Sequence, residues 1–161
     1  MAFNASAVAA AEELRLLAFT SNDAFTLGCA IRSRIQRISK GKQALISIES
    51  AHGQPLFLAT SGEGVQPDNV AWANRKRNSV LRWGVSTATL NLKFKQTGIP
   101  SYFGVTEKDF AIHGGGFPLR VKGVESLVAV VVVSGLAQED DHQVIVDSVK
   151  EFIAEQEKSQ Q

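Results

Sequence analysis

The chain has 161 residues, with 17 basic and 16 acidic side chains, a formal net charge of +1 and a single cysteine. This length predicts one domain over residues 1–161, ending in a short polar C-terminal tail. The balanced charge excludes a strong general attraction for polyanions, so nucleic acid is not an expected partner. The longest apolar run, residues 127–133, is too short to cross a membrane, and no basic leader precedes an apolar stretch, so we expect a cytoplasmic protein without membrane insertion.

Hydrophobic spacing predicts two helices in the first quarter of the chain. Residues 6–17 are rich in alanine, with apolar side chains at helical intervals. Ser21 or Asn22 is predicted to cap a second helix that ends at Gly41. Cys29, within that helix, is predicted to be a small buried residue.

A hairpin and a long helix are predicted next. Residues 44–60 alternate at period two on either side of a turn that places His52 at the hairpin tip. A helix is then expected over residues 67–83 and, after a break at Gly84, on to Lys95.

The last third of the chain is predicted to contain the buried centre of a sheet. Residues 97–117 hold several glycines and a proline, which favours irregular loops. Residues 117–121 and 124–134 are β-rich, and the second segment is apolar on both faces, as in a central strand. Asp140 or Asp141 is predicted to begin the final helix.

The sequence HGGGFP at residues 113–118 is the main candidate ligand site. Three successive glycines can leave backbone amides open to a ligand, so His113, Gly114, Gly115 and Gly116 are candidate binding residues. The alternative is a glycine-rich turn with a solvent-facing histidine. Esterases use a similar glycine run as an oxyanion hole, but the chain lacks the required Gly-x-Ser-x-Gly elbow, so hydrolase chemistry is not expected.

A second histidine follows the central strand. His142 comes directly after Glu139, Asp140 and Asp141, and we consider it with His113 as a candidate metal ligand. Helix capping alone also explains the aspartates. Whether the two imidazoles face one cavity decides between these interpretations.

The predicted helix over residues 67–83 carries aromatic and cationic side chains. Its face formed by positions 72, 76, 79 and 83 contains two tryptophans, and a neighbouring stripe contains cations. Candidate ligand-binding residues here are Arg75, Lys76 and Asn78, and candidate interface residues are Trp72 and Trp83. The alternative is that the tryptophans are buried and the cations reach water.

Three segments resemble the haem-degrading-domain family, which includes GlcG-like and HbpS-like proteins, and within it a fungal and bacterial branch. They are WANRKRNSVLRW at residues 72–83, HGGGFP at 113–118 and VSGLAQEDDH at 133–142, and the resemblance covers a core of about 10–157. It implies an α/β (α+β) protein with a profilin-like three-layer α/β/α sandwich, an antiparallel five-stranded sheet and a homo-oligomer. Trp83 stands where phenylalanine is expected, and Ala137 where proline is usual.

These observations favour a soluble homo-oligomeric protein that binds, or slowly degrades, haem or another small anionic ligand. One alternative is a non-enzymatic assembly or adaptor protein acting through Trp72 and Trp83. Another is an enzyme whose pocket contains a histidine and a metal or cofactor.

Overall fold

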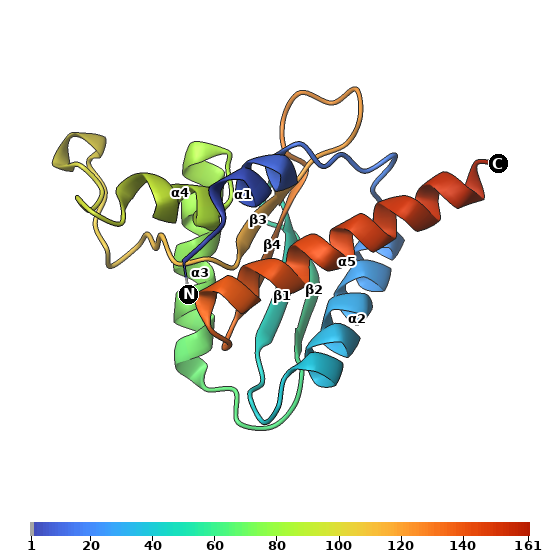
Figure 1. Cartoon of the computed structure of the whole chain (residues 1–161), viewed down its shortest axis with the longest axis horizontal. Helices are drawn as coiled ribbons and strands as arrows, with labels where there is room; N and C mark the ends of the chain where they lie inside the picture. The colour runs from blue at the N-terminus through green and yellow to red at the C-terminus, as the bar shows by residue number, and fades with distance from the viewer. Residues whose placement is uncertain (1) are drawn as a thin grey trace.

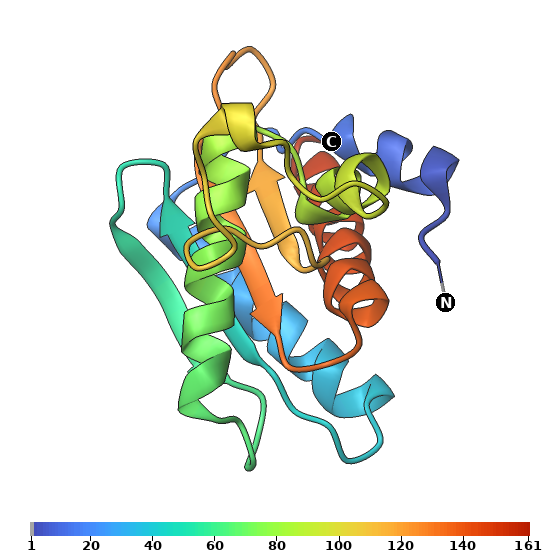
Figure 2. The same ribbon diagram turned by 90° about the vertical axis from the view of Figure 1, so that its left-hand side faces the viewer.

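A computed structural model of the protein describes residues 2–161 and shows one antiparallel sheet with helices on both faces (Figures 1 and 2). The strands lie in the order β2-β1-β4-β3. They are β1 (Leu45–Ser50), β2 (Pro55–Thr60), β3 (Gly116–Leu119) and β4 (Ala129–Ser134). The helices are α1 (Ala5–Glu12), α2 (Ser21–Ile38), α3 (Pro67–Trp83), α4 (Thr87–Phe94) and α5 (Gln138–Ser159), with a short 3-10 helix, η1 (Ser101–Phe103).

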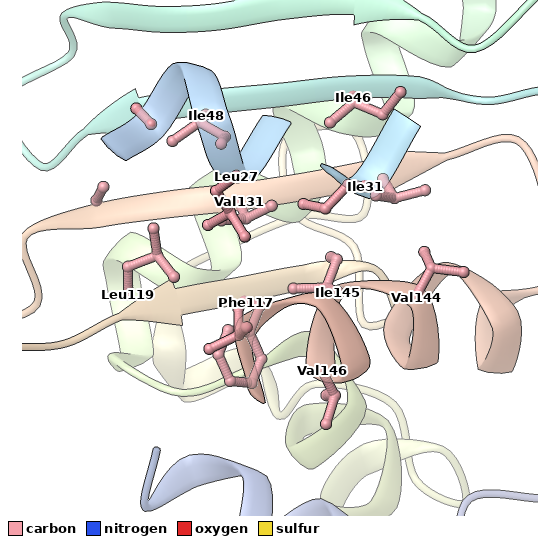
Figure 3. Packing of buried hydrophobic residues seen from close by; sticks show 14 of the residues in the cluster. Leu27, Ile31, Ile46, Ile48, Phe117, Leu119, Val131, Val144, Ile145 and Val146 are labelled. Carbon is pink, nitrogen blue, oxygen red and sulfur yellow. The ribbon is translucent and has the colours of Figure 1, made fainter. Parts of the chain in front are cut away.

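Strand β4 is the centre of the packing. All six of its residues are buried, which confirms the predicted central strand covered on both faces. Val131 and Val133 point into the core beneath α2 and α5, which also includes Ile31 and Ile145 (Figure 3). The alternate valines, Val130 and Val132, pack on the opposite face, where α3 lies. This alternation produces the three layers seen in Figure 2.

The sheet has four strands among the described residues, so the five strands expected from the family resemblance are not present. Where a fifth strand would join the edge of β3, there is a single bridge between Leu16 and Val121. The next residue, Leu17, donates its amide to the side chain of Gln156, and Ala18 accepts a hydrogen bond from the same side chain. These bonds attach the segment to α5, and the bridge to Val121 involves one residue only.

Local chemistry explains why several helix ends differ from the predictions. The first helix ends at Glu12 and the second at Ile38, both earlier than predicted. Thr20 is the N-cap of α2, because its hydroxyl accepts from the amide of Asp23 while the Asp23 carboxylate accepts from the amide of Thr20. Cys29 is exposed, which corrects the prediction that it is buried, since it lies off the face whose residues enter the core.

The hairpin and the central helices follow the predictions closely. Strands β1 and β2 pair antiparallel across a turn that holds the exposed His52. Helix α3 ends where Gly84 adopts a φ of 70°, and α4 follows after three residues. Helix α5 begins at Gln138, two residues before the predicted start, and continues to Ser159 through most of the predicted tail. Within residues 2–161, no helix is long and apolar enough to cross a bilayer.

Candidate functional site

A cavity of about 310 Å³ lies where the end of β4 meets α3 and the beginning of α5. The chain reverses direction here through Gly135, so residues from distant parts of the sequence surround one space. The lining residues are Asn69, Trp72, Lys76, His113, Ser134, Gly135, Leu136, Gln138 and Asp141. The motifs HGGGFP and VSGLAQEDDH, which each contain a histidine, therefore both contribute residues to this cavity. Of their two histidines, only His113 lines it.

A buried ion pair between Lys76 and Asp141 joins α3 to α5 at this cavity. Lys76 Nζ lies 3.0 Å from Asp141 Oδ2, and the two side chains are 4% and 3% exposed. Lys76 Nζ also donates to the carbonyl oxygen of Val133 at 3.1 Å. Asp141 Oδ1 accepts from the amide of Leu136 at 2.9 Å, so one carboxylate fixes both the lysine and the turn after β4.

Burial moves both members of this pair towards their neutral forms. The pKa of Asp141 rises to about 6 because burial penalises the carboxylate more than Lys76 and the nearby amides stabilise it. The pKa of Lys76 is lowered by burial, against the opposing attraction of Asp141. The raised pKa of Asp141 and the lowered pKa of Lys76 both favour transfer of a proton from the ammonium group to the carboxylate, compared with a pair exposed to solvent.

His113 lies at the edge of the cavity against Trp72. The two ring centroids are 4.8 Å apart in an edge-to-face arrangement, and the Arg75 guanidinium lies 4.4 Å from the centre of the tryptophan ring. The pKa of His113 is lowered, first by desolvation and then by the positive charges of Lys76 and Arg75. The imidazole is consequently neutral at pH 7 and keeps a nitrogen lone pair for a hydrogen bond or a metal.

The glycines of the HGGG run serve mainly to pack the loop closely. Gly114 donates its amide to Gln138 Oε1 at 3.0 Å, and Gly116 donates its amide to Thr87 Oγ1 at 2.9 Å. Gly115 has a φ of +124°, and a Cβ there would overlap the Val133 carbonyl oxygen and lie 2.7 Å from Lys76 Nζ. Two of the amides that the sequence suggests for a ligand are thus bound within the chain.

The structure does not bring His142 together with His113. His142 lines a separate cavity of about 70 Å³, where its ring contacts Phe3 and Phe117. Burial lowers its pKa to about 4, and Nδ1 is buried without a hydrogen-bond partner among residues 2–161. Across residues 2–161 there is no group of three or more histidine, cysteine, aspartate or glutamate side chains able to hold a metal ion.

Three other candidate residues of α3, Arg75, Asn78 and Trp83, lie outside the cavity lining. Asn78 donates its side-chain amide to the carbonyl oxygen of Asp109 at 2.9 Å. Trp83 is half-buried against the aromatic rings of Phe94, Phe103 and Phe110. Asn78 and Trp83 both hold the segment after α4 against α3.

Several cavity residues were missed by the sequence analysis, above all Asp141 as a partner of Lys76. Asp141 resembles an ordinary acidic residue at a helix start, and 65 positions separate it from Lys76. Its place in the VSGLAQEDDH motif is the only signal that the sequence offers. Gln138, which binds the glycine loop, belongs to the same motif.

Comparisons with known proteins agree with the motifs that carry the family resemblance. The model of the family described as haem degrading protein HbpS-like matches residues 19–150. A UPF0303 protein of Psychromonas ingrahamii is 36% identical over 150 residues, covering 91% of each chain. The crystal structure of Ybr137w protein is 31% identical, with a TM-score of 0.87 over 94% of this chain and 88% of that one.

A more distant structure, the PduOC:heme complex, is 18% identical, with a TM-score of 0.65 over 81% of this chain and 94% of that one. At this identity the likeness extends to the fold alone. The family match and the curated relative, which together cover most of the sequence, place this chain in the HbpS-like haem-degrading family.

Proposed function

We propose that the protein binds haem, or another small anionic ligand, at the cavity between α3 and α5. The observation that carries this proposal is the position of the His113 imidazole at the cavity edge, beside the Trp72 ring and close to Arg75 and Lys76. The family description and the PduOC:heme complex favour haem among the anionic ligands.

The residues of the cavity suit such a ligand. Haem, when bound, would supply an iron, and His113 is the residue that would hold it through a neutral imidazole nitrogen. Trp72 offers an aromatic surface, and Arg75 is the cation placed to pair with a carboxylate, since Lys76 is already paired with Asp141. The cavity is at the lower end of the range for small-molecule sites, about 300–1,000 Å³, so a porphyrin would enter it with one edge.

A haemin titration tests this proposal. The wild-type protein should give a saturable change in the Soret absorbance, and His113→Ala should weaken binding by about tenfold or more, equivalent to about 1.4 kcal/mol. His52→Ala is the matched control, because it removes an exposed histidine at the far hairpin tip. Equal affinities for the two variants, or no saturable change at all, would refute the assignment of His113.

The same samples test whether the bound haem is degraded. With a reductant and oxygen added, degradation predicts a loss of Soret absorbance that is faster for the wild-type complex than for free haemin. Loss at the rate of free haemin would limit the function to binding.

We also propose that the protein forms a homo-oligomer, and the structure favours the β2 edge over the two tryptophans as the contact. Trp72 and Trp83 pack against side chains of their own chain. Strand β2 lies at the sheet edge, has no charged residue, and leaves Leu58 67% exposed beside Val70, which is 48% exposed. An uncharged edge strand can pair antiparallel with a second copy of itself about a two-fold axis.

Light scattering tests this contact. The wild-type protein should be an oligomer, and Leu58→Lys should shift it towards the monomer, because a charge at a strand edge opposes pairing. Ser33→Lys adds the same charge on an exposed position of α2 and should leave the mass unchanged. A monomeric wild type, or an unchanged mass for Leu58→Lys, would refute the β2 contact.

A further inference from the structure

Lys76 differs from an ordinary surface lysine in both burial and surroundings. Its side chain is 4% exposed, yet it lines the cavity of about 310 Å³, so its amine is removed from bulk water while remaining next to an open space. A lysine in such a position commonly has a function beyond packing, because burying an ammonium group is costly.

The hydrogen bonds around the amine leave one of its positions open. Among the described residues, Lys76 Nζ has two acceptors, the carbonyl oxygen of Val133 and the carboxylate of Asp141. An ammonium group has three N–H donors, whereas a neutral amine has two and keeps a lone pair. Once one proton has passed to Asp141, rotation of the amine about its Cε–Nζ bond turns this lone pair towards a reaction partner in the cavity.

Asp141 provides a site for the proton that the amine must lose. Its Oδ2 atom lies 3.0 Å from Nζ, within the distance needed for direct transfer. The raised pKa of Asp141 and the lowered pKa of Lys76 both reduce the cost of that transfer. Gly115 leaves room for the ion pair itself, since a Cβ there would lie 2.7 Å from Lys76 Nζ and 2.9 Å from Asp141 Cβ.

We propose that Lys76 is a nucleophile that captures a small carbonyl compound, an aldehyde or a 2-oxo acid, as a Schiff base in this cavity. The inference uses the cavity of the proposed function and deepens it by naming a second class of ligand. It also gives the site a covalent chemistry that binding through His113 does not require.

The reaction is balanced without an oxidant or a reductant. The Nζ lone pair forms a bond to the carbonyl carbon, the C=O π bond breaks, and one proton passes from Nζ to the oxygen to give a neutral carbinolamine. Asp141 then returns the proton that it took from Lys76 to the hydroxyl group, the C–O bond breaks and water leaves. The nitrogen lone pair forms the C=N bond of a protonated Schiff base, which is paired with the Asp141 carboxylate. His113, at the cavity edge, is the second group placed to exchange protons with the departing oxygen.

The cavity selects small substrates with a polar end. Asn69, Ser134 and Gln138 add hydrogen-bonding groups to its lining, while Trp72 and Leu136 form apolar walls. Glyoxylate suits this space because it carries an aldehyde for the amine and a carboxylate for the polar groups. It is the probe that we choose for the test.

The experiment traps the Schiff base in the full-length protein. The chain is incubated with glyoxylate and sodium cyanoborohydride at pH 7, digested, and the reduced adducts are located by peptide mass spectrometry. We expect Lys76 to be labelled about tenfold faster or more than the exposed Lys42 and Lys95, since each pKa unit by which an amine is lowered gives tenfold more neutral amine. Labelling of the exposed lysines with Lys76 unmodified would overturn the proposal.

Variants separate this inference from the proposed function. Lys76→Arg keeps a cation beside Asp141 but removes the nucleophile, so the adduct that forms fastest in the wild type should be absent from this variant. Lys42→Arg should still form that adduct. If Lys76→Arg does not fold, the wild-type peptide map decides alone. A protein that binds haemin with Lys76 unlabelled would refute only the Schiff base, and one that labels at Lys76 without binding haemin would refute only the haem site.

Discussion

His113 and His142 are the same residue type, each within a family motif, but they lie in opposite environments. His113 is an exposed residue at the edge of a cavity of about 310 Å³. His142 is 3% exposed and contacts the rings of Phe3 and Phe117 beside a cavity of about 70 Å³. One imidazole faces a space large enough for a ligand, and the other packs as part of the protein interior.

The comparison shows that a lowered pKa alone does not identify a functional histidine. Burial is the largest cause of the lowered pKa in both residues. In His113 the positive charges of Lys76 and Arg75 add to it, which marks a cavity that attracts anions. In His142 the nearby charges belong to Glu12 and Asp147, which oppose the shift, so the neutral ring there reflects packing.

The largest expected effect separates the two residues by stability. His142→Ala removes a buried ring between two aromatic side chains and should destabilise the protein by about 2–4 kcal/mol. His113→Ala removes an exposed ring and should change stability by about 0.5 kcal/mol or less. Urea denaturation of both variants measures the difference directly.

A third variant distinguishes packing from hydrogen bonding at His142. Since Nδ1 has no hydrogen-bond partner, an apolar ring of similar size should replace the imidazole with little loss, and His142→Phe should be much more stable than His142→Ala. The comparison fails if His113→Ala proves as destabilising as His142→Ala, or if His142→Phe is no better than alanine.

Much of the fold was predictable because it depends on local patterns. The alternation in β1 and β2 and the continuous valines of β4 specify strands by their spacing alone. The helix ends were less predictable, since a single hydrogen bond decides them, as Thr20 shows by capping α2 ahead of the predicted Ser21 or Asn22. The segment at Leu17 and Ala18 is hydrogen-bonded to Gln156, a contact between opposite ends of the chain that no local pattern predicts.

The candidate site was predictable in part. The sequence indicates His113 and the cationic helix face separately, and the structure places His113, Trp72 and Lys76 around one cavity. The role of Asp141 could not be derived, because a contact across 65 residues leaves no periodic pattern. The function of Gly115 was also hidden, since a close approach to Val133 looks the same in sequence as a flexible turn.

The dependence of stability on pH tests whether His142 must stay neutral in the folded protein. Its pKa falls from 6.5 to about 4 on folding, so the unfolded chain binds a proton more readily. The stabilisation is complete above pH 6.5 and is lost as the pH falls from 6.5 towards 4, with a total of up to about 3 kcal/mol. The His142→Phe variant should not lose this stability as the pH falls. Urea denaturation of the variant and the wild type at several pH values from 7 to 4 measures the difference.

The contribution of Asp141 to stability has the opposite pH dependence. The difference in stability between the wild type and His142→Phe is therefore more informative than the stability curve of either protein. The pKa of Asp141 rises from 3.8 to about 6, so its contribution is complete below pH 3.8 and is lost as the pH rises towards 6. Wild type and His142→Phe both contain Asp141, and its contribution cancels when their stabilities are subtracted. The remaining difference should move in favour of His142→Phe as the pH falls, and parallel curves would show that the folded protein accommodates a charged His142.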